Sequence, residues 1–157
     1  MKIIKILSDT IVNIDNIVAM DYIKIPVKAQ DNETYLYHYL LIYLKALINN
    51  ETYLLKFVGE TEKSKELLQK TYEDILEHID KEKYIKIGNF YITKDFSLAT
   101  PISPSEISIS SILEDPILMS HIENKEKILS FITTSSFVYL LSENYDIALN
   151  ELLNINS

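Results

Sequence analysis

The sequence lacks cysteine, arginine and tryptophan, and it contains only two glycines, Gly59 and Gly88. Without cysteine, disulfide bonds and thiolate metal ligands are excluded, and a reducing intracellular compartment is the simplest setting. With two isolated glycines, the glycine-rich loops that cradle phosphates in P-loop and dinucleotide-binding proteins are absent. The composition therefore excludes several large classes of enzyme and binding protein.

All 15 basic residues are lysines, and with 23 acidic residues the chain of 157 residues has a net charge of −8. Arginine is the usual side chain for two-pronged binding of phosphate or guanine, so we expect no direct nucleic-acid binding. An acidic chain could instead bind a basic surface, including one that normally binds nucleic acid. Moderate acidity also simply keeps a small protein soluble, and we favour that interpretation.

The longest apolar stretch, from Tyr35 to Ile48, is interrupted by His38 and Lys45. A membrane-spanning helix needs about 20 apolar residues, so this stretch is too short. The opening residues 1–6 are too few and too charged for a signal peptide. We therefore expect no membrane association and a cytoplasmic location.

The apolar fraction of 47% predicts a folded core. We expect a β-rich first module over residues 1 to about 82. Residues 3–6 and 10–14 are predicted to be short strands. Residues 19–28 alternate apolar and polar side chains, with Ile23, Ile25 and Val27 on one face, which is the period of a half-buried strand.

The apolar run 35–48 could be a helix or a strand, and the turn signal Asn49-Asn50 with a second run over 51–58 favours a β-hairpin. Such a hairpin has one apolar face and one amphipathic face. With Ile48 facing Glu51, the expected pairs are Ala46 with Tyr53, Leu44 with Leu55, Ile42 with Phe57, Lys45 with Leu54 and Tyr43 with Lys56.

An amphipathic helix is predicted over about 61–80, with Thr61 as its N-cap and Glu62 in its first turn. Its apolar residues recur at spacings of three and four, from Leu67 to Ile79. We expect this helix to lie across the apolar face of the sheet and to close the first module.

The opening Ile11-Val12-Asn13-Ile14-Asp15-Asn16-Ile17, the hairpin, and the Gly59-Glu60 step into a helix through Leu67-Leu68 occur in a characteristic order. In this order and spacing the N-terminal half resembles short uncharacterised proteins of low-GC Gram-positive bacteria and their phages. The resemblance covers about half the chain and implies a structural framework without a transferable activity.

A second α+β module is expected over about 83–157, packed on the first. Residues 83–87 echo 2–6, residues 90–93 echo 10–13, and Glu151-Leu152-Leu153 echoes Glu66-Leu67-Leu68. A degenerate duplication of a ββββα unit and a coincidence of composition remain equally open.

Within this module, Ser103-Pro104-Ser105-Glu106 predicts the start of a helix that runs to about Glu114. Asp115-Pro116 then begins a short turn through Ile122. Residues 128–132 and 137–141 form either a hairpin or a buried helix, and their β-branched and aromatic content favours the hairpin. Asn144 is expected to cap a last helix, which completes an α+β fold with antiparallel sheets and helices packed on one face.

Candidate catalytic groups are scattered along the sequence. His38, His78 and His121 share no metal-ligand spacing, and the acidic residues are typical of turns and solvated helix faces. We expect no enzyme activity, no metal and no cofactor. A polar pocket lined by two or more of His38, His121 and the acidic residues would favour a small-molecule binder or weak hydrolase instead.

Tyrosines stand out on the long strand, where alternate positions share one side. Tyrosine combines a large apolar area with a hydrogen-bonding hydroxyl, which suits protein interfaces. Packing against the second module, or ladders of tyrosines across the strands of a half-exposed sheet, is the competing interpretation, and we favour it. The candidate partner-binding face comprises Tyr35, Tyr37, Tyr39, Tyr43, Lys45 and Lys56, with Tyr22 and Lys24 of matching polarity on their own strand.

These features lead to three functional hypotheses. The first is a non-enzymatic interaction or inhibitor protein, such as a phage or mobile-element accessory protein, that acts by binding the surface of another protein. The second is a homodimeric scaffold or immunity-type protein whose tyrosine face is the dimer contact. The third is a small-molecule binder or weak hydrolase with a pocket between the two halves.

Overall fold

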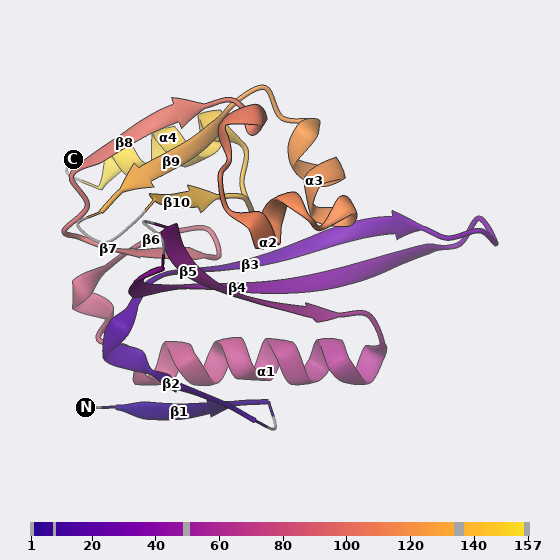
Figure 1. Ribbon diagram of the computed structural model, residues 1–157, viewed down its shortest axis with the longest axis horizontal. Helices are drawn as coiled ribbons and strands as arrows, with labels where there is room; N and C mark the ends of the chain where they lie inside the picture. Colours follow the sequence, from indigo (N-terminus) through magenta and orange to yellow (C-terminus); the bar gives the residue numbers. More distant parts are fainter. Residues whose placement is uncertain (1, 8, 49–50, 134–136, 156–157) are drawn as a thin grey trace.

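The computed structural model describes residues 2–7, 9–48, 51–133 and 137–155 (Figure 1). It shows an α+β fold with antiparallel sheets, as expected. The turn residues Asn49 and Asn50 and residues 134–136 lie outside the described residues.

The central element is a five-stranded antiparallel sheet with the strand order β5-β4-β3-β7-β6. The long hairpin of β3 and β4 forms its middle, and β5 continues it on one side. On the other side, β7 pairs with β3 through Ala19 and Met20. The strands are β3 (Ile17–Lys28), β4 (Thr34–Ile48), β5 (Glu51–Gly59), β6 (Tyr84–Ile87) and β7 (Phe90–Thr93).

The central sheet contains strands from both sides of the module boundary that we expected near residue 82. That boundary therefore does not separate one sheet from the other. The β6–β7 hairpin follows that boundary in the sequence, but it completes the sheet begun by β3, β4 and β5. The charged segment before this hairpin is the 3-10 turn η2 (Lys81–Lys83). It has the composition of a linker, but it contacts β6. The two halves therefore share one sheet.

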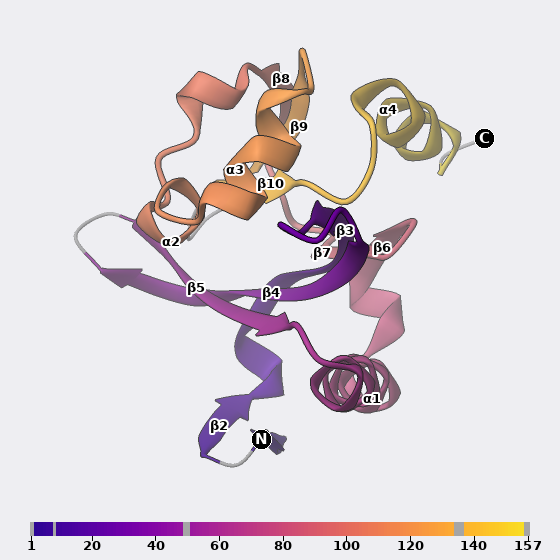
Figure 2. The ribbon, with the colours of Figure 1, turned by 90° about the vertical axis from the view of Figure 1, so that its right-hand side faces the viewer.

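The helix α1 (Glu62–His78) covers one face of this sheet, as predicted (Figure 2). Thr61 caps it, since its Oγ1 accepts the Ser64 N–H at 3.1 Å. Beside α1, the β1–β2 hairpin and the 3-10 turn η1 extend the same apolar layer. Their bounds are β1 (Ile3–Ile6), β2 (Thr10–Asn13) and η1 (Ile14–Asn16).

The opposite face carries a second antiparallel sheet with the order β10-β9-β8. This sheet stands on the first with β10 nearest to it and β8 farthest away (Figures 1 and 2). The helices α2 and α3 lie on one side of it and α4 on the other (Figure 2). The elements are β8 (Leu98–Ile102), η3 (Pro104–Glu106), α2 (Ser110–Leu113), α3 (Pro116–Glu123), β9 (Ile128–Ile132), β10 (Phe137–Leu140) and α4 (Tyr145–Asn154).

The long helix expected from Ser103 to about Glu114 is wrong. Glu106 does accept the Ser103 N–H at 3.1 Å, but the turn it closes is only the 3-10 turn η3. The residues that follow, Ile107 to Ser110, alternate isoleucine and serine, both weak helix formers. Ile107 and Ile109 are both buried at a spacing of two, so the chain stays extended there and only α2 is helical. Conversely, the expected short turn after Asp115 is the helix α3.

The expected hairpin register holds next to the turn, where Ile48 faces Glu51. An irregularity between Leu44 and Leu47 then shifts the pairing, so that Leu44 faces Tyr53 and Tyr43 faces Leu54. All five expected pairs farther from the turn are therefore wrong: Ala46 with Tyr53, Leu44 with Leu55, Ile42 with Phe57, Lys45 with Leu54 and Tyr43 with Lys56. Because the shift amounts to two residues, the strand keeps its predicted faces: Leu40, Ile42 and Leu44 face α1, and Tyr39, Leu41 and Tyr43 face the second sheet.

The two halves of the chain repeat one order of elements. Each begins with a short hairpin (β1–β2 or β6–β7), continues with a three-stranded meander (β3–β5 or β8–β10) and ends with a helix (α1 or α4). The strands that echo one another in sequence occupy equivalent places in this order. The duplication stays a prediction: the shared order has five strands rather than the expected four, η3, α2 and α3 occur in the second half alone, and β6–β7 joins the central sheet whereas β1–β2 forms a sheet of its own.

Candidate partner-binding ribbon

The inner part of the tyrosine-lined strand is buried within the chain itself. Tyr39 and Tyr43 are 1% and 0% exposed, and both face the second sheet and its helices. The Tyr39 hydroxyl donates to an Asp115 carboxylate oxygen and the Tyr43 hydroxyl to the Tyr139 carbonyl, both at 3.1 Å. Burial raises the pKa of both phenols, so they remain protonated donors. The role expected for these two tyrosines in an external binding face is therefore wrong.

Lys56 belongs to the same internal junction. Its ammonium donates to the Ser111 carbonyl at 2.9 Å and to the other Asp115 carboxylate oxygen at 3.0 Å. Burial alone would raise the pKa of Asp115, but the Leu118 amide and the Lys56 ammonium bring it below its ordinary value. Asp115 thus binds both Tyr39 and Lys56, which joins the main sheet to the start of α3.

Asp21 is a third connection across the junction, and the expectation that the acidic residues lie in turns or on solvated faces is wrong for it. Its carboxylate is fully buried and accepts the backbone N–H groups of Tyr22, Leu141 and Ser142 at 3.0 to 3.1 Å. Burial raises the pKa of Asp21 to about 6, although these amides act in the opposite direction. The sequence signal that could have found it is a single acid in the otherwise apolar stretch 17–23.

Tyr22 and Lys24 lie on the other face of the sheet from the tyrosines of β4, so their expected membership of one face is wrong. Tyr22 pairs with Leu40 and its ring packs against Tyr72 of α1, with ring centroids 5.0 Å apart. Its hydroxyl lies 2.6 Å from His38 Nδ1, and burial raises its pKa to about 12. Lys24 is exposed on that face, across from His38.

The three remaining residues of the expected binding face, Lys45, Tyr37 and Tyr35, do not all lie together. Lys45 is exposed far along β4, where it borders a surface pocket with Asp15 and Tyr84. Tyr37 is half-buried, and Tyr35 is 45% exposed. Of the expected face, only Tyr35 and Tyr37 therefore remain together at the surface.

These two tyrosines lie on a two-stranded ribbon that projects beyond the rest of the sheet (Figure 1). The ribbon consists of residues 24–37, the outer part of the β3–β4 hairpin. Along β3 the pairing with β7 is confined to Ala19 and Met20, and along β4 the pairing with β5 begins at His38 opposite Gly59. Within the described chain, both outer edges of the ribbon thus lack a neighbouring strand.

The backbone of β3 is protected along its outer edge. At the tip, the Ala29 N–H donates to the Glu33 carbonyl at 2.9 Å. Since backbone groups alternate in direction along a strand, odd-numbered residues of the ribbon point inward and even-numbered residues point outward. The outward residues of β3 are Lys24, Pro26 and Lys28. Proline has no N–H to donate and lysine discourages strand addition, so this edge resists a further strand.

Among the residues that the structure describes, none protects the outer edge of β4 in this way. Its outward-pointing residues are Thr34 and Leu36. Their backbone N–H and carbonyl groups point away from β3, at positions that β5 does not reach. The side chains of Tyr35 and Leu36 are 45% and 40% exposed there, on opposite faces of the ribbon. An unprotected edge with exposed apolar side chains is a favourable site for a strand from another protein.

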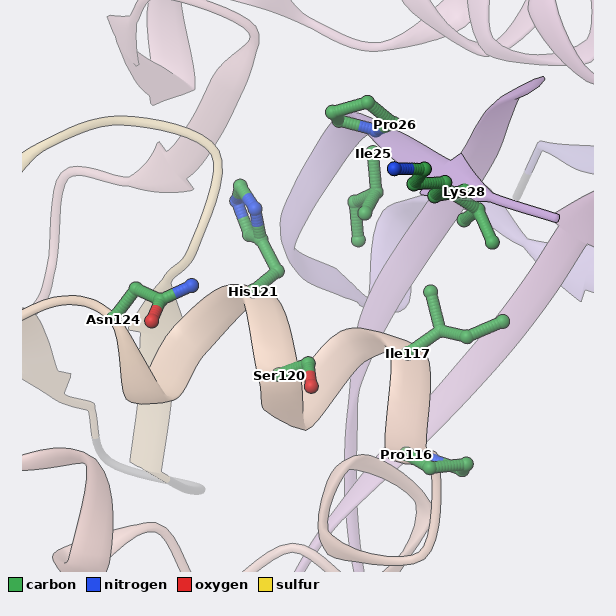
Figure 3. A pocket seen from close by; sticks show the side chains of 9 residues that line it. Ile25, Pro26, Lys28, Pro116, Ile117, Ser120, His121 and Asn124 are labelled. Carbon is green, nitrogen blue, oxygen red and sulfur yellow. The ribbon is translucent and has the colours of Figure 1, made fainter. Parts of the chain in front are cut away.

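A groove of about 390 Å³ runs along the other side of the ribbon, between β3 and α3 (Figure 3). The side chains of Ile117 and His121 project from α3 toward the strand that carries Ile25 and Pro26 (Figure 3). Lys28 lies at the outer end of this lining. Burial lowers the pKa of His121, so the groove presents a neutral imidazole and apolar walls.

The groove does not have the composition that would support the hydrolase hypothesis. Its lining includes His121 but neither His38 nor an acidic side chain. Among the described residues, no group of three histidine, aspartate or glutamate side chains could hold a metal ion. No helix in the described ranges is long and apolar enough to cross a membrane.

Comparisons of the chain with models of protein families, with curated proteins and with solved structures find no match.

Proposed function

We propose that this chain is a non-enzymatic protein-interaction or inhibitor protein that binds its partner through the β4 edge, Thr34 to Tyr37, of the projecting ribbon of residues 24–37. The observation that carries the proposal is the combination, at one place, of an unprotected strand edge and exposed apolar side chains at Tyr35 and Leu36. Ile25 of the ribbon is buried in the core, but the side chains of Tyr35 and Leu36 are left exposed, and exposed apolar groups at one place are typical of contact sites.

The inner part of β4 has a structural role, whereas its outer part is available for binding. Tyr39 and Tyr43 stabilise the junction between the two halves and so anchor the inner end of β4. A ribbon fixed at its base and free at its tip presents a preformed contact surface, which lowers the entropy cost of binding.

The test is capture of a partner from a lysate of the source cells by the immobilised protein, with mass-spectrometric identification and a direct binding assay on the protein identified. Tyr35→Glu places a charge on the ribbon, and we expect it to weaken binding at least tenfold. The matched control is Leu153→Glu on α4, since Leu153 is 66% exposed and far from the ribbon in sequence. We expect it to bind like the wild type. Capture of no protein, or equal capture by both variants, would contradict the proposal.

A further inference from the structure

We infer that the partner supplies a short, extended, lysine- or arginine-rich segment, which pairs with the outer edge of β4 at Thr34 to Tyr37. This inference rests on the proposed function and specifies its mode of binding.

Strand addition is possible on β4 and disfavoured on β3. On β4, Thr34 and Leu36 direct their N–H and carbonyl groups outward, which allows up to about four hydrogen bonds to an added strand. On β3 the residue directly across from Leu36 is Pro26, and the one across from Thr34 is Lys28. The ribbon therefore has one edge that can accept a strand.

The free edge is short, and acidic residues lie at both of its ends. Glu33 and Asp31 are exposed at the ribbon tip, and Glu60 is exposed where β5 leaves β4, whereas the exposed lysines of the ribbon, Lys24 and Lys28, lie on β3, one strand farther from this edge. Four strand residues span roughly 13 Å, so a partner segment of four or five residues fills the space. Basic residues flanking that segment would lie near these carboxylates, and such complementarity favours encounter and register.

The same charges disfavour a second copy of this chain as the occupant. Antiparallel pairing of β4 with another β4 would bring the Glu33 end of one ribbon against the Gly59-Glu60 end of the other, twice by symmetry. Each copy also has a net charge of −8. Like-charge contacts of this kind oppose association.

The test measures fluorescence anisotropy of a labelled peptide, Lys-Val-Thr-Val-Thr-Lys, with the full-length protein. A matched peptide carries glutamate in place of both lysines. We expect the lysine peptide to bind at least tenfold more tightly than the glutamate peptide, with an affinity that falls as salt rises.

Two proline variants locate the edge. Leu36→Pro removes an outward N–H on β4, and we expect it to weaken binding at least tenfold. Lys28→Pro removes an outward N–H from the other edge of the same ribbon, and we expect a change of less than twofold. Circular dichroism checks that both variants are folded. If Leu36→Pro does not fold, the double variant Glu33→Lys/Glu60→Lys replaces it, with reversal of the peptide preference as the expected result.

Equal binding by Leu36→Pro and the wild type, no preference for the lysine peptide, or a dimer in light scattering that Leu36→Pro abolishes would each overturn this inference. A partner that is captured in a Tyr35-dependent manner would still support the proposed function, so the two failures are distinguishable.

Discussion

At the scale of single residues, the tyrosines of β4 differ in role although they share one face of one strand. Tyr43 is fully buried and donates to the Tyr139 carbonyl, whereas the exposed Tyr35 donates to Asp31 at 3.0 Å. The difference follows from what covers the face: the second sheet covers its inner end, and the ribbon extends past that cover.

This difference predicts unequal effects of removing each hydroxyl. Tyr43→Phe leaves the Tyr139 carbonyl without its donor in a buried place, so we expect it to lower the free energy of unfolding by about 1–2 kcal/mol. Tyr35→Phe removes an exposed hydrogen bond and should change it by less than about 0.5 kcal/mol. Urea unfolding of both variants measures this, and equal effects would contradict the assignment.

The raised pKa of the buried Asp21 carboxyl group predicts that the stability of the protein depends on pH. Burial raises its pKa from 3.8 to about 6, so the folded protein holds the proton more firmly than the unfolded chain. Between about pH 4 and pH 6 the folded state therefore binds more protons, and the contribution of Asp21 to stability decreases as pH rises. From the pKa difference, this loss amounts to about 2–3 kcal/mol by pH 7.

The variant Asp21→Asn isolates that contribution because asparagine does not titrate. The difference in the free energy of unfolding, wild type minus variant, should decrease by about 2–3 kcal/mol from pH 4 to pH 7. Guanidinium unfolding at several pH values measures it. A difference that stays constant, or increases with pH, would show that Asp21 is not the buried acid described here.

At the scale of elements, the turn from β5 into α1 depends on a close backbone approach at Gly59. A Cβ atom there would lie 3.1 Å from the backbone N and Cα of Lys65 in the first turns of α1. We expect Gly59→Ala to move the helix from the sheet and to lower the free energy of unfolding by about 1–3 kcal/mol. Urea unfolding tests this, and a variant as stable as the wild type would contradict the tight contact.

Elements with a local signal could be predicted from the sequence. The capped helix α1, the alternating strand β3 and the two hairpin strands β9 and β10 all follow from period and capping residues. The strand β8 was not predicted, because Leu98 to Ile102 contains Pro101 and lacks a clear alternation. The bulge in β4 was not predicted either, since two extra residues leave the faces of the strand unchanged.

The candidate site was predicted in part. The sequence identified the tyrosine strand and Lys56 as unusual but could not show which layer covers them. Burial of Tyr39 depends on α3, which is 76 residues away at Asp115. Tyr22 was assigned to the wrong face because its polarity resembles that of the β4 tyrosines, whereas its register partner is Leu40. Contacts between residues far apart in the chain produce no regular spacing of residues from which they could be predicted.

At the scale of the whole molecule, the two halves form one cooperative unit. β6 and β7 complete the sheet of the first half, and Leu41 and Tyr43 are 0% exposed because the second half covers them. We therefore expect a fragment of residues 1–82 not to fold alone, and the full chain to unfold in a single transition. Coincident far-ultraviolet and near-ultraviolet circular dichroism curves test this, and a stably folded fragment would contradict it.

The ribbon projects from this cooperative unit, and we propose that the outer edge of β4 on the ribbon pairs with a strand of the partner. Amide hydrogen exchange, measured by NMR at saturating lysine peptide, tests this at individual N–H groups. We expect at least tenfold slower exchange at the Thr34 and Leu36 N–H groups, with the exchange at Lys24 and Lys28 unchanged. Slower exchange at Lys24 and Lys28, or no change at Leu36 when the peptide is bound, would contradict it.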